Sequence, residues 1–189
     1  MKILKVVLIA IVALIALALV VAAVLPSQAH VERSIVVDAP DSAVYAAVAD
    51  FTVWEVWNPW TKMEPGAERS ISGEPGTVGS TWRWSGDTIG IGSLTIAEMD
   101  PYASIRSKLV FEAPRESQAD DIWRFESVDG GTRVTWIYDG PLGYPVERLF
   151  GPFLDGMLGP QYEQGLSDLK EYVESQAAMP ADTMGSDQY

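Results

Sequence analysis

The chain has 189 residues, no cysteine, one histidine and a formal charge of −13, from 13 basic and 26 acidic side chains. Without cysteine there is no disulfide framework, thiolate metal site or thiol nucleophile, and a single histidine argues against a histidine-based metal site or a Ser–His triad. The acidic balance argues against nucleic-acid binding, because phosphate recognition needs lysine and arginine, so we expect no metal, no cofactor and no nucleic-acid partner.

The first predicted element is an apolar helix. Residues 6–25 hold no charged or polar side chain, and Lys2 and Lys5 precede them. As a helix these 20 residues span about 30 Å, the thickness of the hydrocarbon core of a bilayer. Because positive charge favours the cytoplasmic side, we expect a single-pass inner (plasma) membrane protein with a cytoplasmic N-terminus and an extracytoplasmic domain. Residues 1–29 are then anchor and linker.

A cleaved signal peptide is the alternative interpretation. Small residues near Ala29 would permit cleavage before His30 and release a secreted domain. The apolar run is longer than the roughly 7–15 residues of a signal-peptide core, which favours an anchor. His30 is predicted to be a linker residue.

A single domain is expected over residues 30–175, followed by a disordered tail over residues 176–189. It opens with a strand at 31–37 and a short helix from about 41. Trp54, Trp57 and Trp60 then recur every three residues, which places them on one helical face. Five further strands are predicted from alternating apolar residues at 80–85, 89–97, 104–111, 121–126 and 132–138.

The last predicted element is a long amphipathic helix that starts at Val146 and carries apolar residues at helical spacing as far as Val173. Pro152 and Pro160 lie within this pattern, so we expect either two helical segments or one kinked helix. Strands in series with one long helix predict an α+β fold, with helices on one face of an antiparallel sheet.

Aromatic residues form the main candidate site. Several fall on the same faces of their predicted strands and can line a cavity that shields an apolar or ring-bearing ligand, with indole N–H groups as polar anchors. Ordinary core packing is the competing interpretation for any one of them. The candidates are Trp54, Trp57, Trp60, Trp82, Trp84, Trp123, Phe125, Trp136 and Tyr138.

Carboxylates are the candidates for chemistry. A carboxylate in an apolar cavity would have a raised pKa and could serve as an acid or base, whereas most acidic residues simply face solvent or cap an element. The adjacent pair Asp120 and Asp121 lacks a third ligand for a metal. The remaining candidates are Asp50, Glu55, Asp87, Glu98, Asp139 and Glu163.

Motifs along residues 31–174 resemble those of the START-like SRPBCC superfamily, in particular its polyketide cyclase/dehydrase-like branch. The resemblance rests on the order and spacing of several short motifs rather than on any one of them. They are Ala39-Pro40 after the first strand, Val44-Tyr45 with Val48 and Asp50, Trp57-Asn58-Pro59-Trp60, Gly79-Ser80 with Trp82 and Trp84, Gly131 to Trp136, and Tyr162 to Leu166 leading to Leu169-Lys170.

The resemblance implies a helix-grip fold, in which a curved antiparallel sheet wraps around a long C-terminal helix and leaves a cavity between them. It also implies a hydrophobic small molecule or lipid as ligand. Our leading hypothesis is a membrane-anchored binding domain for such a ligand. The alternatives are a cyclase/dehydratase-like enzyme that uses a cavity carboxylate or Tyr138, and an interaction module of an envelope complex, which would have its cavity filled by tryptophan.

Overall fold

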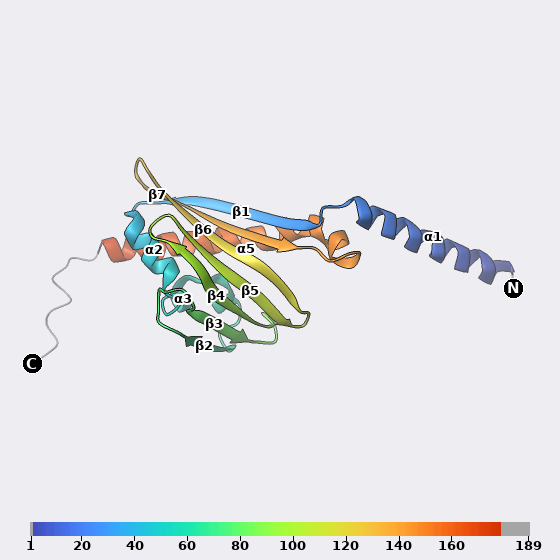
Figure 1. The fold of residues 1–189 in the computed structure, drawn as a ribbon, viewed down its shortest axis with the longest axis horizontal. Coiled ribbons are helices and arrows are strands. Elements are labelled where there is room, and N and C mark those ends of the chain that lie inside the picture. Colours follow the sequence, from blue (N-terminus) through green and yellow to red (C-terminus); the bar gives the residue numbers. More distant parts are fainter. Residues whose placement is uncertain (1, 179–189) are drawn as a thin grey trace, which may run out of the picture.

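The computed structural model describes residues 2–178. Its first element, helix α1 (Lys2–Val24), projects away from the rest of the molecule (Figure 1). The helix has 23 residues and is apolar enough to cross a membrane, a test that a signal sequence also passes. Ala22 is its one described buried residue, so packing against the domain does not account for the apolar surface of α1.

Seven antiparallel strands form one sheet in the order β1-β7-β6-β5-β4-β3-β2. Apart from the β1–β7 pairing, neighbours in the sheet are neighbours in sequence, as expected for strands joined by hairpins. The strands are β1 (Gln28–Val37), β2 (Glu68–Ser72), β3 (Thr81–Ser85), β4 (Ile91–Asp100), β5 (Ser104–Ala113), β6 (Ser117–Val128) and β7 (Gly131–Pro141).

Two features of the sheet differ from the prediction. Strand β2 was not predicted, because it lies at the sheet edge and its mostly exposed, polar residues give no apolar alternation. His30 is not a linker residue: it lies inside β1, opposite Asp139 of β7, and its Nδ1 is 2.6 Å from that carboxylate. Strand β1 therefore begins at Gln28, three residues after Leu25.

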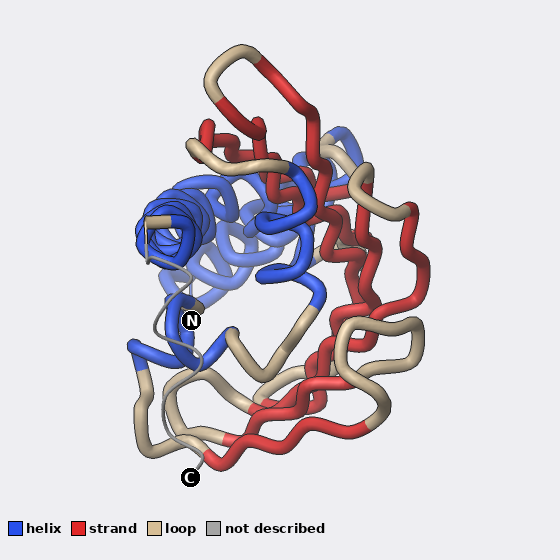
Figure 2. Tube along the Cα trace, turned by 90° about the vertical axis from the view of Figure 1, so that its left-hand side faces the viewer, coloured by secondary structure: helices blue, strands red, loops and turns tan. Residues whose placement is uncertain are grey.

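The four helices that follow α1 lie on the concave side of the sheet. Short helices α2 (Asp41–Ala49), α3 (Trp54–Trp57) and α4 (Pro59–Met63) fill one end, and the long helix α5 (Val146–Ala177) runs along the sheet. Figure 2 shows the strands curving around these helices. The predicted α+β helix-grip architecture is confirmed.

Helix α5 is a single element of 32 residues that contains both Pro152 and Pro160. Each proline removes one backbone hydrogen bond, but the helix is not divided into the two segments that the prediction allowed. It also extends to Ala177, past the predicted domain boundary at residue 175, while residues 179–189 of the predicted tail lie outside the described residues.

The apolar stripe predicted along α5 divides into two parts. In the second half Tyr162, Leu166, Leu169 and Val173 are buried in the core. In the first half the apolar residues either line a cavity or face outward. Those that face outward are Val146, Phe150, Phe153 and Met157, which are 46–65% exposed.

Candidate functional site

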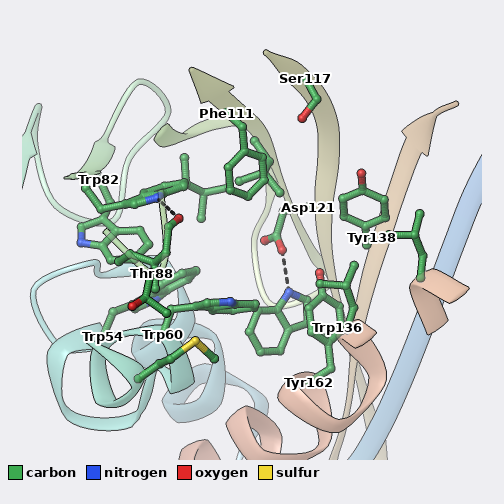
Figure 3. A pocket seen from close by; sticks show the side chains of 17 residues that line it. Trp54, Trp60, Trp82, Thr88, Phe111, Ser117, Asp121, Trp136, Tyr138 and Tyr162 are labelled. Carbon is green, nitrogen blue, oxygen red and sulfur yellow. Dashed lines mark hydrogen bonds between the residues drawn. The ribbon is translucent and has the colours of Figure 1, made fainter. Parts of the chain in front are cut away.

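A cavity of about 390 Å³ lies between the concave face of the sheet, helices α3 and α4, and the first half of α5 (Figure 3). Its size falls within the range of small-molecule sites. Aromatic and aliphatic side chains make most of its wall. The residues that line it are Trp54, Trp60, Met63, Trp82, Trp84, Thr88, Ile89, Leu94, Leu109, Phe111, Ser117, Asp121, Trp136, Tyr138, Leu154, Leu158 and Tyr162.

Six of the nine aromatic candidates line this cavity, namely Trp54, Trp60, Trp82, Trp84, Trp136 and Tyr138. The other three are core residues and do not reach it. Trp57 is fully buried beneath Trp54 and Trp123, with its ring centroid 5.9 Å from that of Trp123. Phe125 lies farther along β6, where its ring packs edge-on against Tyr45 of α2. The cavity occupies the other end of β6, near Ser117 and Asp121.

The most unusual residue of the cavity is the carboxylate Asp121. The residue is only 4% exposed, and its carboxylate accepts hydrogen bonds from two indole groups, Trp136 Nε1 to Oδ1 at 2.6 Å and Trp123 Nε1 to Oδ2 at 2.8 Å. Burial raises its pKa to about 7, although the two indole N–H groups oppose the shift. No lysine, arginine or histidine of the described chain lines the cavity to neutralise it.

A stack of three aromatic rings holds this carboxylate in place. The ring of Trp136 stacks on Trp123 at a centroid distance of 4.2 Å and on Tyr162 at 4.1 Å, so β6, β7 and α5 are joined through it. Gly165 permits this packing, because a Cβ at that position would lie 2.7 Å from the Trp136 ring. Both indole donors to Asp121 are therefore fixed by the core.

Two tyrosines add hydroxyl groups to the cavity wall. Burial raises the pKa of Tyr138 and raises that of Tyr162 well above its ordinary value, so both phenols stay protonated. Neither hydroxyl forms a hydrogen bond within the described part of the chain, and Figure 3 shows Tyr138, Tyr162 and Asp121 along one side of the cavity. Each can donate to or accept from a ligand.

The loop between β3 and β4 forms another part of the wall and is held by Glu64, the residue after α4. Its carboxylate accepts backbone N–H groups of Asp87, Thr88 and Ile89 at 2.8, 2.9 and 3.0 Å. These hydrogen bonds, with the one from Ile89 first, lower the pKa of Glu64. Glu64 thus fixes the two cavity residues Thr88 and Ile89.

None of the six carboxylates singled out from the sequence lines the cavity. They bind partners elsewhere: Asp50 accepts hydrogen bonds from Thr52, Asp139 contacts His30, and Glu163 pairs with Arg33 at 2.7 Å. The residue that does line it, Asp121, was considered only as a metal ligand with Asp120. Consecutive strand residues point to opposite faces, so Asp120 instead pairs with Arg106 and Lys108 on the outer face.

Comparisons with known proteins agree with this architecture. The profile of a family described as polyketide cyclase/dehydrase and lipid transport matches residues 28–174. No curated protein sequence matched the chain.

Solved structures share the fold at low sequence identity. A protein from Mesorhizobium loti superposes with a TM-score of 0.59 at 14% identity, over 79% of this chain and 99% of that chain. The Zhui aromatase/cyclase from Streptomyces sp. R1128 superposes with a TM-score of 0.57 at 20% identity, over 82% of this chain and 98% of that chain. At these identities the likeness shows the fold alone.

Proposed function

Since the chain belongs to the polyketide cyclase/dehydrase and lipid transport family, we propose that its cavity binds a hydrophobic small molecule or lipid. The observation that carries the proposal is a cavity of about 390 Å³ whose wall is mostly apolar and aromatic. Burying apolar ligand surface in such a site contributes about 25 cal/mol per Å². The tryptophan side chains line this cavity without filling it, which favours ligand binding over an interaction module with a tryptophan-filled interior.

The polar groups of the cavity indicate which hydrogen-bonding groups the ligand has. Asp121 has one lone pair left on each oxygen after its two indole hydrogen bonds, and Tyr138 and Tyr162 offer hydroxyls on the same side. A ligand that places a hydrogen-bond donor at Asp121 and its rings or acyl chain against the tryptophans satisfies both parts of the wall. We therefore expect an apolar molecule with one polar end.

In this proposal helix α1 anchors the domain to the membrane. Held in a bilayer by residues 6–25, the domain would stay where hydrophobic molecules partition, on the extracytoplasmic side of the inner membrane. Cleavage before His30 would instead release it, and would also remove Gln28 and Ala29 from strand β1. The mass of the mature chain from membranes distinguishes the two cases.

The binding proposal is tested by titrating the full chain with lipid and quinone extracts while tryptophan fluorescence and melting temperature are followed. Leu109→Phe narrows the cavity, and Val110→Phe places the same phenylalanine side chain one residue along β5, outside the cavity. We expect ligand to quench the fluorescence and raise the melting temperature of the wild type and Val110→Phe but not of Leu109→Phe. Saturating extracts without effect on the wild type would refute the proposal.

Acid–base catalysis is a second candidate function, favoured by the single observation that Asp121 has a pKa of about 7 inside the cavity. Such a group can take a proton from the carbon beside a ketone and return it to a leaving β-hydroxyl, which yields an enone and water. The test is ultraviolet absorbance of the enone from an aromatic β-hydroxy ketone. We expect Asp121→Asn to abolish turnover and keep binding; no turnover by the wild type would dismiss catalysis of this dehydration.

A further inference from the structure

The first three turns of α5 carry an exposed apolar face that neither the core nor the cavity uses. Phe150, Phe153 and Met157 are 62%, 64% and 65% exposed, and Val146 is 46% exposed. At 100° per residue these four positions fall within an arc of about 60°, so they form one stripe. We call residues 146, 150, 153 and 157 the outer stripe. An exposed contiguous apolar face of this kind marks an interaction surface.

The outer stripe ends abruptly along the helix. The same helical face continues through Gln164 and Glu171, which are exposed and polar. The buried face of α5 shows the reverse order, since its core residues begin at Gly159. Whatever covers the outer stripe therefore covers only the first half of α5.

That half is the one beside α1. Figure 1 shows α1 leaving the domain at the end where β1 begins and α5 starts, and the two helices contact one another. Only Leu25, Pro26 and Ser27 separate α1 from β1, a distance of about 10 Å at full extension. The start of α5 therefore cannot move far from the membrane surface when α1 is inserted.

One hydrogen bond shows how far along α1 the segment before α5 reaches. Tyr144, just before α5, donates its hydroxyl to the carbonyl oxygen of Leu19 at 3.1 Å. Leu19 precedes the end of α1 at Val24 by five residues, or about 8 Å. The Tyr144 hydroxyl thus reaches into the outer part of the apolar span of α1, just below the membrane–water interface near which tyrosine is favoured, and the Arg148 guanidinium lies 5.7 Å from the centroid of the Tyr144 ring.

We propose that the outer stripe of α5 contacts the headgroup layer of the bilayer that anchors α1, with the start of α5 nearest the hydrocarbon core. This inference rests on the proposed membrane anchoring. The apolar face, its limit at Met157 and the position of Tyr144 near the interface all fit a lipid surface. Leu154 and Leu158, on the neighbouring face of the same turns, line the cavity. The first half of α5 thus has the cavity on one face and the outer stripe on the neighbouring face.

The test uses the absence of native cysteine. Full-length single-cysteine variants, each labelled with an environment-sensitive fluorophore, are placed in phosphatidylcholine nanodiscs that contain spin-labelled lipid as quencher. Phe153→Cys probes the outer stripe, Gln164→Cys is the matched control farther along the same face, and Val12→Cys probes α1. We expect loss of most emission at positions 12 and 153 and little loss at 164, since interfacial helices bury their apolar face about 5–10 Å deep.

The possible outcomes distinguish membrane docking of the outer stripe from membrane anchoring by α1. Quenching at position 12 without quenching at 153 would overturn membrane docking while the anchor stands. A disulfide between two unlabelled Phe153→Cys chains under oxidising conditions, with no quenching at 153 in the labelled sample, would assign the stripe to a second copy and also overturn membrane docking. Absence of quenching at position 12 would refute the anchor and the docking together, whereas ligand binding by the same samples is measured independently.

Discussion

The two halves of α5 have similar apolar spacing and opposite surroundings. Leu169 and Val173 in the second half are fully or almost fully buried, whereas Phe153 and Met157 in the first half are about two-thirds exposed. The second half holds the sheet through Tyr162 and Gly165, and the first half walls the cavity and faces outward. The second half therefore stabilises the fold, whereas the first half is the part that we propose contacts ligand and membrane.

The largest expected effect is on the second half. Leu169→Ala removes a fully buried side chain and should lower the free energy of unfolding by about 3 kcal/mol, the cost of a core cavity. Denaturant unfolding of the full chain in detergent, followed by tryptophan fluorescence, measures this. A loss below about 1 kcal/mol would mean that the second half does not carry the fold.

The next effect concerns Asp121, beside the ring stack that joins the second half to the sheet. Its folded-state pKa of about 7 lies above its ordinary value of 3.8, so the folded protein binds the proton more tightly between these values. The free energy of unfolding should therefore fall as pH rises through this window, by about 2 to 3 kcal/mol from pH 5 to pH 8.

The control for this pH effect is Asp121→Asn, whose stability should change little between pH 5 and pH 8. Several surface carboxylates have lowered pKa values, so their stabilisation is lost only at more acidic pH. They are Glu64, Asp120, Asp155 and Glu174. The same slope in wild type and variant would contradict the assignment to Asp121.

A matched pair of glycines compares the two halves directly. A Cβ at Gly165 would meet the Trp136 ring at 2.7 Å and Pro59 at 3.0 Å, whereas one at Gly156 meets nothing within 4 Å. We expect Gly165→Ala to destabilise by about 1–3 kcal/mol through overpacking, and Gly156→Ala to stabilise by about 0.5–1 kcal/mol through its better helix propensity. Thermal and denaturant unfolding measure both variants. A change of the same sign in the free energy of unfolding of both would contradict the difference between the two halves.

The smallest expected effect is on the outer stripe. Phe153→Ser should change the free energy of unfolding in detergent by less than about 0.5 kcal/mol, because that ring is 64% exposed. The measurement is the same denaturant titration used for Leu169→Ala. A loss as large as that of Leu169→Ala would show that Phe153 belongs to the core.

Much of the fold could be predicted from the sequence, because alternation and helical spacing are strong along β6, β7 and α5. The edge strand β2 could not, since polar exposed residues leave no periodic signal. The sequence left open whether Pro152 and Pro160 divide α5, because the missing hydrogen bonds do not by themselves end a helix that packs along a whole sheet.

The candidate site was predicted in part for a similar reason. Alternation identifies which face of a strand is apolar, but not which end of that face meets a helix, so Trp123 and Phe125 were assigned to the cavity and lie in the core. The same alternation places Asp121 on the face of Trp123 and Phe125, so the sequence already indicated that this carboxylate points inward. From the sequence it was considered only together with Asp120, as a metal ligand.

Native mass spectrometry of the full chain extracted from membranes tests most directly whether the cavity binds an apolar ligand. For the wild type and Val110→Phe we predict an apolar molecule retained at one copy per chain and released on unfolding. Leu109→Phe, with its narrowed cavity, should lose that molecule. Equal occupancy in all three chains, or none in the wild type, would contradict a ligand-binding cavity.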